Sequence, residues 1–288
     1  MKKLLFFLAM ALFLSPATVI SKAADYSSRL EKIIAGEARL FPGTPGIFFL
    51  DLKAGKKIKV NAEVSFPAAS LIKVPILIEV FKEAREGRIR LDRKLTVTRK
   101  DQVGGSGILK SATPGSKITV LKAATLMIQE SDNTATDMLI RLVGMEAVNG
   151  TMEKIGCRRT FLKRTIWDFD AADRGRDNVT SPQDMALMLA SIENASFLDK
   201  DSCLAMKNIL LGQKRRNLMT ARLPKDLPVA HKTGGLSGIL HDCGIIYVPG
   251  RPCILCLLGK DIRDAEKAQE SWRRISQEIY LEMKKQGP

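Results

Sequence analysis

Three short motifs, in a fixed order along the chain, constrain its fold and chemistry more than any other feature. They read Ser70-Leu71-Ile72-Lys73, Ser131-Asp132-Asn133 and Lys232-Thr233-Gly234. Together they supply the residue types of a serine acyl-transfer site that works without a catalytic histidine. The first motif brings a nucleophile and its base, the second a proton relay and an amide, and the third a cation and a strand edge. A chain that uses all three must fold distant segments onto one site.

Ser70 and Lys73 are predicted at the start of a helix, 70–86. Phe66-Pro67 disfavours helix before this point, so Ser70 falls where free backbone N–H groups stabilise a developing oxyanion. Lys73 follows at i+3, on the same helix face. A serine hydroxyl needs an adjacent base, and a lysine acts as one only if burial or a second cation lowers its pKa. The alternative for Lys73 alone is an ordinary surface lysine, because S-x-x-K arises by chance about once in such a chain.

Ser131-Asp132-Asn133 separates two predicted helices, 119–130 and 132–142. Because Ser, Asp and Asn are all good N-caps, a capping triplet is the structural interpretation of this motif. In the functional interpretation Ser131 relays a proton to the leaving nitrogen. Asn133 then holds an amide of the substrate.

Lys232-Thr233-Gly234 lies in a predicted strand, 229–233, whose edge could pair with a substrate amide. In the functional interpretation Lys232 and Thr233 bind a substrate carboxylate, and Lys232 also lowers the pKa of Lys73. The backbone N–H of Gly235 is the candidate second oxyanion donor. An ordinary strand end, with a glycine that permits the bend, is the alternative. His231 precedes Lys232, so in a strand it points to the opposite face and is predicted to be structural.

Strand patterns occur near both ends of the chain, and helical patterns fill the middle. Apolar strands are predicted at 46–52, 243–248 and 253–258, and a helix at 265–284. The predicted fold class is therefore α+β: one antiparallel sheet from both chain ends, flanked by helices, with an inserted all-α lobe. The sheet lobe is placed at about 24–66 and 224–288 and the helical lobe at about 67–223. A groove between two lobes is a natural ligand site.

The first residues have the pattern of a signal peptide. Met1-Lys2-Lys3 precedes a short apolar run, 4–14, and small residues follow, which predicts cleavage after Ala23. We expect export to the periplasm or beyond, without stable membrane insertion of residues 24–288; an uncleaved anchor is the alternative. The net charge of +15 suits an anionic cell envelope. Nucleic-acid binding is disfavoured, because the basic residues are scattered and only 6% of residues are aromatic.

Five cysteines, an odd number, do not have the spacing of a disulfide framework, and we expect buried thiols: Cys157, Cys203, Cys243, Cys253 and Cys256. Cys253 and Cys256 form a C-x-x-C pattern, but they lie in an apolar predicted strand. Only two histidines are present, which disfavours a metal site. We expect the protein to be a monomer.

The motifs together resemble those of class A β-lactamases, a branch of the penicillin-recognising serine enzymes. The likeness runs from about Leu30 to Gln277. Further matching segments are Gly105-Ser106-Gly107-Ile108-Leu109, residues 131–139, Thr180-Ser181-Pro182 and Asp242-Cys243-Gly244-Ile245-Ile246. The resemblance implies a two-lobed fold, no cofactor, and a substrate with a β-lactam or acyl-D-alanine unit. It also implies that Ser70 and Gly235 share the oxyanion hole.

One departure from the family concerns the glutamate that assists deacylation, which lies before Thr180-Ser181-Pro182 in a pattern such as Glu-x-x-Leu-Asn. Residues 160–173 contain no glutamate, and counting places Thr165 or Ile166 at that position. Asp168 is the nearest carboxylate and the candidate substitute base, with a capping or solvated aspartate as the alternative. Asn178 stands where the family often has an aspartate that holds this loop.

Three functions follow from these residues. The first is an exported class A-type β-lactamase that opens β-lactam rings through a Ser70 acyl-enzyme and gives antibiotic resistance. The alternative is a D-alanyl-D-alanine peptidase of penicillin-binding type that acts on peptidoglycan peptides; the missing glutamate favours it, because its β-lactam adduct would be long-lived. A β-lactam sensor that traps the acyl group ranks last.

Overall fold

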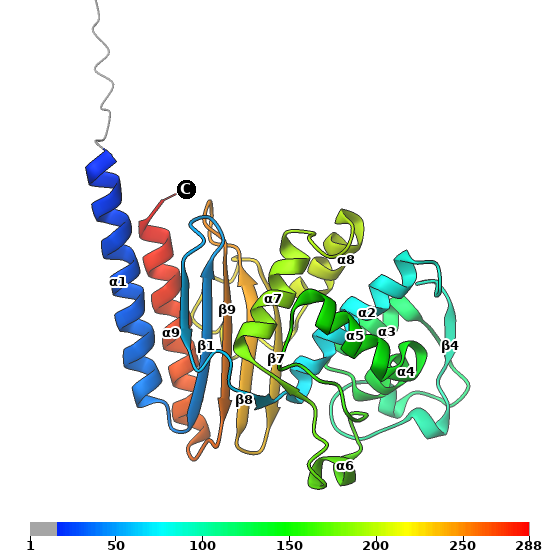
Figure 1. Cartoon of the computed structure of the whole chain (residues 1–288). Helices are drawn as coiled ribbons and strands as arrows, with labels where there is room; N and C mark the ends of the chain where they lie inside the picture. The colour runs from blue at the N-terminus through cyan, green and yellow to red at the C-terminus, as the bar shows by residue number, and fades with distance from the viewer. Residues whose placement is uncertain (1–15, 288) are drawn as a thin grey trace, which may run out of the picture.

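Strands from both ends of the chain form one antiparallel sheet in this computed structural model, which describes residues 16–287 (Figure 1). The strand order is β2-β1-β9-β8-β7. Their bounds are Thr44–Asp51 for β1, Lys57–Val60 for β2, Val229–Leu236 for β7, Ile239–Ile246 for β8 and Cys253–Lys260 for β9. Thr44 pairs with Lys260, and Lys232 pairs with Cys243. The predicted α+β class and the antiparallel sheet from both chain ends are confirmed.

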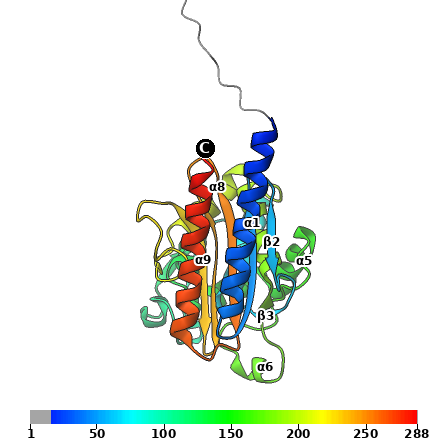
Figure 2. The same ribbon diagram turned by 90° about the vertical axis from the view of Figure 1, so that its left-hand side faces the viewer.

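Two long helices, α1 (Pro16–Leu40) and α9 (Ala265–Lys285), lie side by side on one face of the sheet (Figure 2). Side chains of a strand alternate between the two faces, so Ile47 and Phe49 pack toward these helices while Phe48 packs on the other side. Trp272 of α9 is fully buried in this layer.

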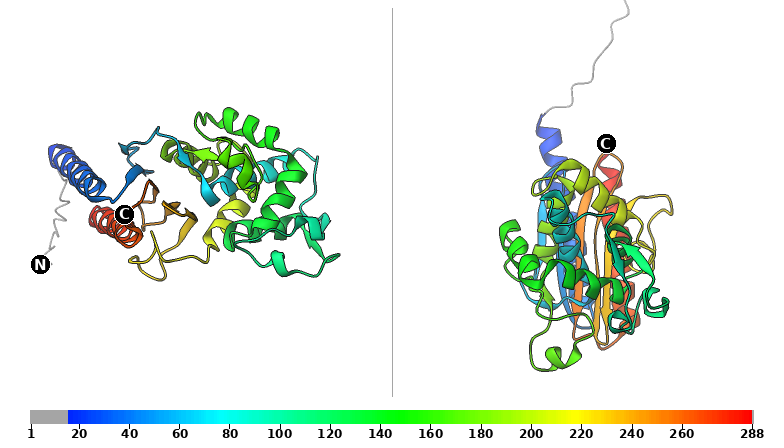
Figure 3. Two further views of the ribbon diagram at one scale, coloured as in Figure 1. Left: turned by 90° about the horizontal axis from the view of Figure 1, so that it is seen from below. Right: turned by 90° about the vertical axis from the view of Figure 1, so that its right-hand side faces the viewer.

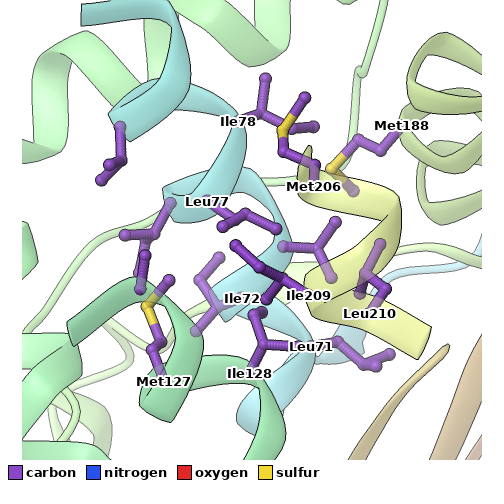
Figure 4. Packing of buried hydrophobic residues seen from close by; sticks show 14 of the residues in the cluster. Leu71, Ile72, Leu77, Ile78, Met127, Ile128, Met188, Met206, Ile209 and Leu210 are labelled. Carbon is purple, nitrogen blue, oxygen red and sulfur yellow. The ribbon is translucent and has the colours of Figure 1, made fainter. Parts of the chain in front are cut away.

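The remaining helices cover the opposite face and extend away from it (Figure 3). Their bounds are Lys73–Arg85 for α2, Val120–Gln129 for α3, Asn133–Val143 for α4, Met145–Ile155 for α5, Phe169–Asp173 for α6, Pro182–Glu193 for α7 and Lys200–Leu211 for α8. Helix α2 is buried among its neighbours: Leu77 and Ile78 pack with Met127 of α3 and Met206 of α8 in one apolar cluster (Figure 4). This packing fixes the first turn of α2 relative to the sheet.

Several short elements have no counterpart in the sequence pattern. A 3-10 turn, Ala69–Ile72, precedes α2, so the expected helix 70–86 begins in a tighter form. Strand β3 (Phe66–Pro67) pairs with β6 (Val179–Thr180), and β4 (Lys94–Thr96) pairs with β5 (Lys117–Thr119). The β3–β6 pair joins the segment before Ser70 to the end of the loop that precedes α7.

All five cysteines are buried and unpaired, as expected. Most of the predicted signal peptide, residues 1–23, lies outside the described residues, and its last part belongs to α1. Among residues 16–287, no helix is long and apolar enough to cross a membrane.

Candidate active site

Ser70, Lys73 and Ser131 form a closed hydrogen-bonded set. The Nζ of Lys73 lies 3.2 Å from the Oγ of Ser70 and 3.0 Å from the Oγ of Ser131. The Ser131 Oγ donates to the Ser70 Oγ at 2.9 Å. Lys73 also donates to the Ser131 carbonyl at 2.7 Å and to the Oδ1 of Asn133 at 2.8 Å. The first two sequence motifs therefore meet at one buried amine.

Burial makes Lys73 a usable base. Its side chain is fully buried, and the loss of hydration lowers its pKa from the usual value of 10.5 to about 7. Asp132 and Asp137 oppose this shift of the pKa, and Arg215 adds to it. Since the pKa is near neutrality, a large fraction of the amine is unprotonated at neutral pH and can accept a proton.

Lys232 lies on the other side of Ser131, with its Nζ 3.1 Å from the Ser131 Oγ. It is fully buried, and burial lowers its pKa, with a further contribution from the like charge of Lys73. Thr233 and Gly234 follow on β7. A methyl group at Gly234 would lie 3.3 Å from His241 and 3.4 Å from the Ala68 carbonyl, so glycine lets β7 pass close to the segment before Ser70.

The backbone is strained at two residues next to Ser70, its chain neighbour Ala69 and its hydrogen-bond partner Ser131. Ala69 has φ +44° and Ser131 has φ +55°, values that residues with side chains rarely adopt. Such residues persist where the surroundings hold them, and they concentrate at functional sites. Here the Ala68 N–H donates to the Asn178 carbonyl at 2.8 Å and so anchors the segment before Ser70.

Asp132 has the position that the capping interpretation of the second motif predicts. Its Oδ1 caps α4 by accepting from Ala135 N at 2.8 Å. Its Oδ2 accepts from the N–H groups of Ile108 and Leu109, at 2.7 and 2.8 Å. The capping residue thus ties the 104–109 loop to α4, while its neighbours Ser131 and Asn133 point to Lys73.

His241 is a site neighbour that the sequence interpretation missed. Its ring is fully buried beside Gly234; Nε2 donates to the Pro67 carbonyl at 2.8 Å, and Nδ1 accepts from Gly259 N at 3.2 Å. Burial lowers its pKa from 6.5 to about 4, so the ring is neutral. His241 therefore holds the segment that leads to Ser70. His231 bonds to Asp242 at 2.8 Å on the other face of the sheet, as predicted for a structural histidine.

The loop 161–179 does not bring Asp168 to the nucleophile. Asp168 is exposed and caps α6 by accepting from Ala171 N at 3.0 Å, and it does not line the pocket at Ser70. Asp168 therefore has the position of a capping aspartate, which is the alternative interpretation of this residue. Arg164 forms an ion pair with Asp177 at 2.8 Å, and Asn178 accepts from Lys163 N and Arg164 N at 2.7 and 3.1 Å. These bonds tie the two ends of the loop to each other.

A pocket of about 250 Å³ opens over Ser70. The residues that line it are Ala69, Ser70, Gly105, Ser106, Asn133, Arg164, Ile166, Trp167, Phe169, Asn178, Gly235 and Leu236. Gly235, the candidate oxyanion donor, is among these lining residues. None of these lining residues carries a carboxylate. The sequence interpretation missed the aromatic side chains; the only signal for them was the Gly104-Gly105 pair, which leaves space beside the site.

The structure brings together Ser70, Lys73, Ser131, Asn133 and Lys232, and it leaves Asp168 outside. Thr233 and Gly234 lie next to Lys232 on β7. The site thus has a hydroxyl beside a buried amine whose pKa is about 7, a second hydroxyl and a second amine.

Comparisons with known proteins agree with this geometry. The model of the beta-lactamase enzyme family matches residues 27–283. A beta-lactamase from Streptomyces albus G is 27% identical over 252 residues, which cover 83% of this chain and 80% of the relative. A solved beta-lactamase from Sphaerobacter thermophilus superposes with a TM-score of 0.79 at 26% identity, covering 93% of this chain and 98% of that one. The solved structure of PBP-A gives a TM-score of 0.80 at 29% identity, covering 91% and 96%. The chain therefore belongs to the beta-lactamase enzyme family.

Proposed function

We propose that this enzyme opens β-lactam rings through an acyl-enzyme on Ser70. The observation that carries the proposal is the hydrogen-bonded line Lys73–Ser70–Ser131–Lys232, with a Lys73 pKa of about 7. Neutral Lys73 takes the proton of Ser70 as the Oγ attacks the lactam carbonyl. The carbon–nitrogen bond breaks, and the proton passes from Lys73 through Ser131 to the leaving nitrogen.

The other groups at the site suit the charges that develop. The backbone N–H groups of Ser70 and Gly235 stabilise the oxyanion, and Lys232 with Thr233 binds the substrate carboxylate. Asn133 holds the amide of the acyl side chain. These steps use only groups of the protein.

Deacylation requires a base for water, and Lys73 is the group that can serve. After acylation its proton has passed to the leaving nitrogen, so the amine is neutral again beside the ester oxygen. Water then attacks the ester carbonyl, Lys73 takes the proton of that water, and Ser70 recovers its own proton as it leaves. We assign Asp168 no part in this step, because it is exposed and caps α6.

A D-alanyl-D-alanine peptidase is the second candidate function. The residues lining the pocket support it, because none of them carries a carboxylate and Ile166 is among them. The structural neighbour PBP-A has also been solved as a point mutant, in an acyl-enzyme complex with penicillin G. A peptidase would form the same acyl-enzyme with a β-lactam and release it slowly.

We further propose that the protein acts outside the cytoplasm, in the periplasm or beyond, as a monomer. The charged and apolar N-terminal pattern supports export, and the net charge of +15 suits an anionic envelope. Its substrates would then be β-lactam antibiotics, which would give resistance, or peptidoglycan peptides.

The test is turnover of a chromogenic cephalosporin by the purified protein. Many turnovers per molecule support β-lactam hydrolysis. A single burst with a stable adduct on Ser70, seen by mass spectrometry, would contradict it; release of D-alanine from a peptide ending in D-Ala-D-Ala would then establish the peptidase. Ser70→Ala is the control and should abolish every adduct.

A further inference from the structure

Trp167 occupies the space that two glycines leave open on the facing loop. A methyl group built at Gly104 would lie 2.5 Å from the Cζ2 of Trp167, and one at Gly105 would lie 2.9 Å from its Cζ3. Neither contact is possible for a real side chain, so the indole depends on both glycines. Trp167 thus reaches from the 161–179 loop to the 104–107 loop and closes one end of the pocket above Ser70.

A column of contacts fixes this indole. The rings of Trp167 and Phe169 lie 5.0 Å apart at 71°, an edge-to-face arrangement. The guanidinium of Arg164 lies 5.6 Å from the centre of the Phe169 ring. Arg164 is itself buried and paired with Asp177. The two rings are therefore held in place before any ligand arrives.

We propose that Trp167 and Phe169 form a wall that binds an aryl group on the acyl side of the substrate. The inference rests on the proposed acylation of Ser70, and it adds a preference for acyl donors whose side chain ends in a flat aromatic ring. Both rings line the pocket, together with Ile166. Trp167 and Phe169 nevertheless remain 42% and 43% exposed, so a ligand ring can still cover them.

The size and charge of the pocket favour such a group. A cavity of about 150 Å³ accommodates benzene, and the present pocket of about 250 Å³ leaves room for the linking atoms. Arg164 is the one charged residue among its lining residues, and Asp177 already neutralises it. The two aromatic rings give a charged side chain no ionic partner, so such a group would lose hydration against them, whereas an aryl group would not. The cation Arg215 contacts the pocket at Ser106, 3.0 Å from its Oγ.

The experiment compares acylation rates, as the second-order constant, for penicillin G and for 6-aminopenicillanic acid, which lacks the aryl arm. In the wild type we expect penicillin G to react faster. Trp167→Ala should lower the ratio of the two constants about tenfold. This is the effect expected from the loss of one aromatic contact and of the apolar area that it buries. Gly104→Ala should shift the ratio in the same direction. Its methyl group displaces the indole, although Trp167 and Phe169 themselves are not mutated.

Phe161→Ala is the matched control. Phe161 belongs to the same loop and is also 42% exposed, but it does not line the pocket, so the ratio should stay at the wild-type value. An unchanged ratio in both Trp167→Ala and Gly104→Ala would overturn the proposal. An equal loss for both substrates would also overturn it, because it would show a general effect on loop structure.

A binding measurement separates this proposal from the proposed function. Trp167 is the exposed tryptophan, and Trp272, the second one in the chain, is fully buried. Titration with phenylacetylglycine should therefore change the tryptophan fluorescence, while acetylglycine should not, and Trp167→Ala should remove the change. This outcome supports the wall even if no β-lactam acylates Ser70. Equal responses to the two ligands would contradict it.

Discussion

Lys73 combines two demands that usually conflict, because it is buried and yet it must exchange a proton. Burial lowers its pKa to about 7, so the reactive neutral amine is the form that gains as pH rises. We therefore expect the acylation rate to rise between about pH 5 and pH 9 with a midpoint near pH 7. Stopped-flow measurement with penicillin G would show it, and a rate independent of pH would contradict Lys73 as the base. Lys73→Ala should lower the rate by about 10²–10⁴ and remove this dependence.

His241 should give the protein a measurable sensitivity to acid. Its folded pKa of about 4 lies below the ordinary value of 6.5, so the unfolded chain binds a proton first as pH falls. The contribution of His241 to the free energy of unfolding is therefore fully present above pH 6.5. It decreases by about 3 kcal/mol as the pH falls toward 4. In His241→Gln this part of the pH dependence should be absent. Urea unfolding of both proteins from pH 4 to 7 tests it; parallel curves would show that His241 contributes nothing.

At the scale of elements, Asn178 is predicted to hold the 161–179 loop. Its side chain accepts from Lys163 N and Arg164 N, and its Nδ2 donates to the Arg164 carbonyl at 3.1 Å. Asn178→Ala leaves these buried groups unpaired, and we expect a loss of about 2–3 kcal/mol. Faster hydrogen exchange at Lys163 and Arg164 would locate the effect in the loop.

Asp168→Ala is the control for Asn178→Ala, because it changes another residue of the same loop. It removes the cap of α6, which costs about 1 kcal/mol, and it leaves the bonds of Asn178 intact. Because Asp168 does not line the pocket, we expect the rate of acyl-enzyme breakdown to be unaffected. Slower breakdown, followed by mass spectrometry of the adduct, would return Asp168 to the mechanism.

The elements that can be predicted from the sequence are those with many periodic residues. The pattern predicts a helix over 119–130 and Val120–Gln129 is found, and the strand predicted at 253–258 is β9, because each buries a long apolar face. The short β3–β6 pair is not predictable, since two residues carry no periodic pattern and their pairing depends on the tertiary fold.

The same difference, between a pattern in the sequence and a contact made by the tertiary fold, decides which site residues can be predicted. Ser70, Lys73, Ser131 and Lys232 lie in motifs whose spacing reflects helix and strand geometry. The positions of Trp167 and His241 depend on which loop or backbone passes nearby, as with Gly104 and Pro67. The missing carboxylate in 160–173 is visible in the sequence, but only the folded loop shows which side chains line the pocket in its place.

For the whole molecule, a buried polar cluster attaches α1 to the sheet. The Asp51 carboxylate accepts from Tyr26 OH at 2.9 Å and from Arg251 Nε at 2.8 Å. Arg251→Ala would leave this buried carboxylate without its cation, and we expect a loss of about 3 kcal/mol. Arg90→Ala, which removes a fully exposed pair with Asp92, should leave the midpoint of unfolding nearly unchanged. Equal midpoints of urea unfolding for the two variants would contradict a role for the cluster.

The pairing of β1 with β9 has a consequence for how the chain acquires its fold. Asp51 pairs with Cys253, so the central strand of the sheet is synthesised only after the long segment that separates it from β1. Until β9 is present, β1 has an unpaired edge and the layer under α1 cannot close. Such long-range pairing makes folding slow, because the two strands can meet only after the segment between them has been made. The five-stranded sheet and the helix layer that covers it can therefore close only after β9 and α9 have been synthesised.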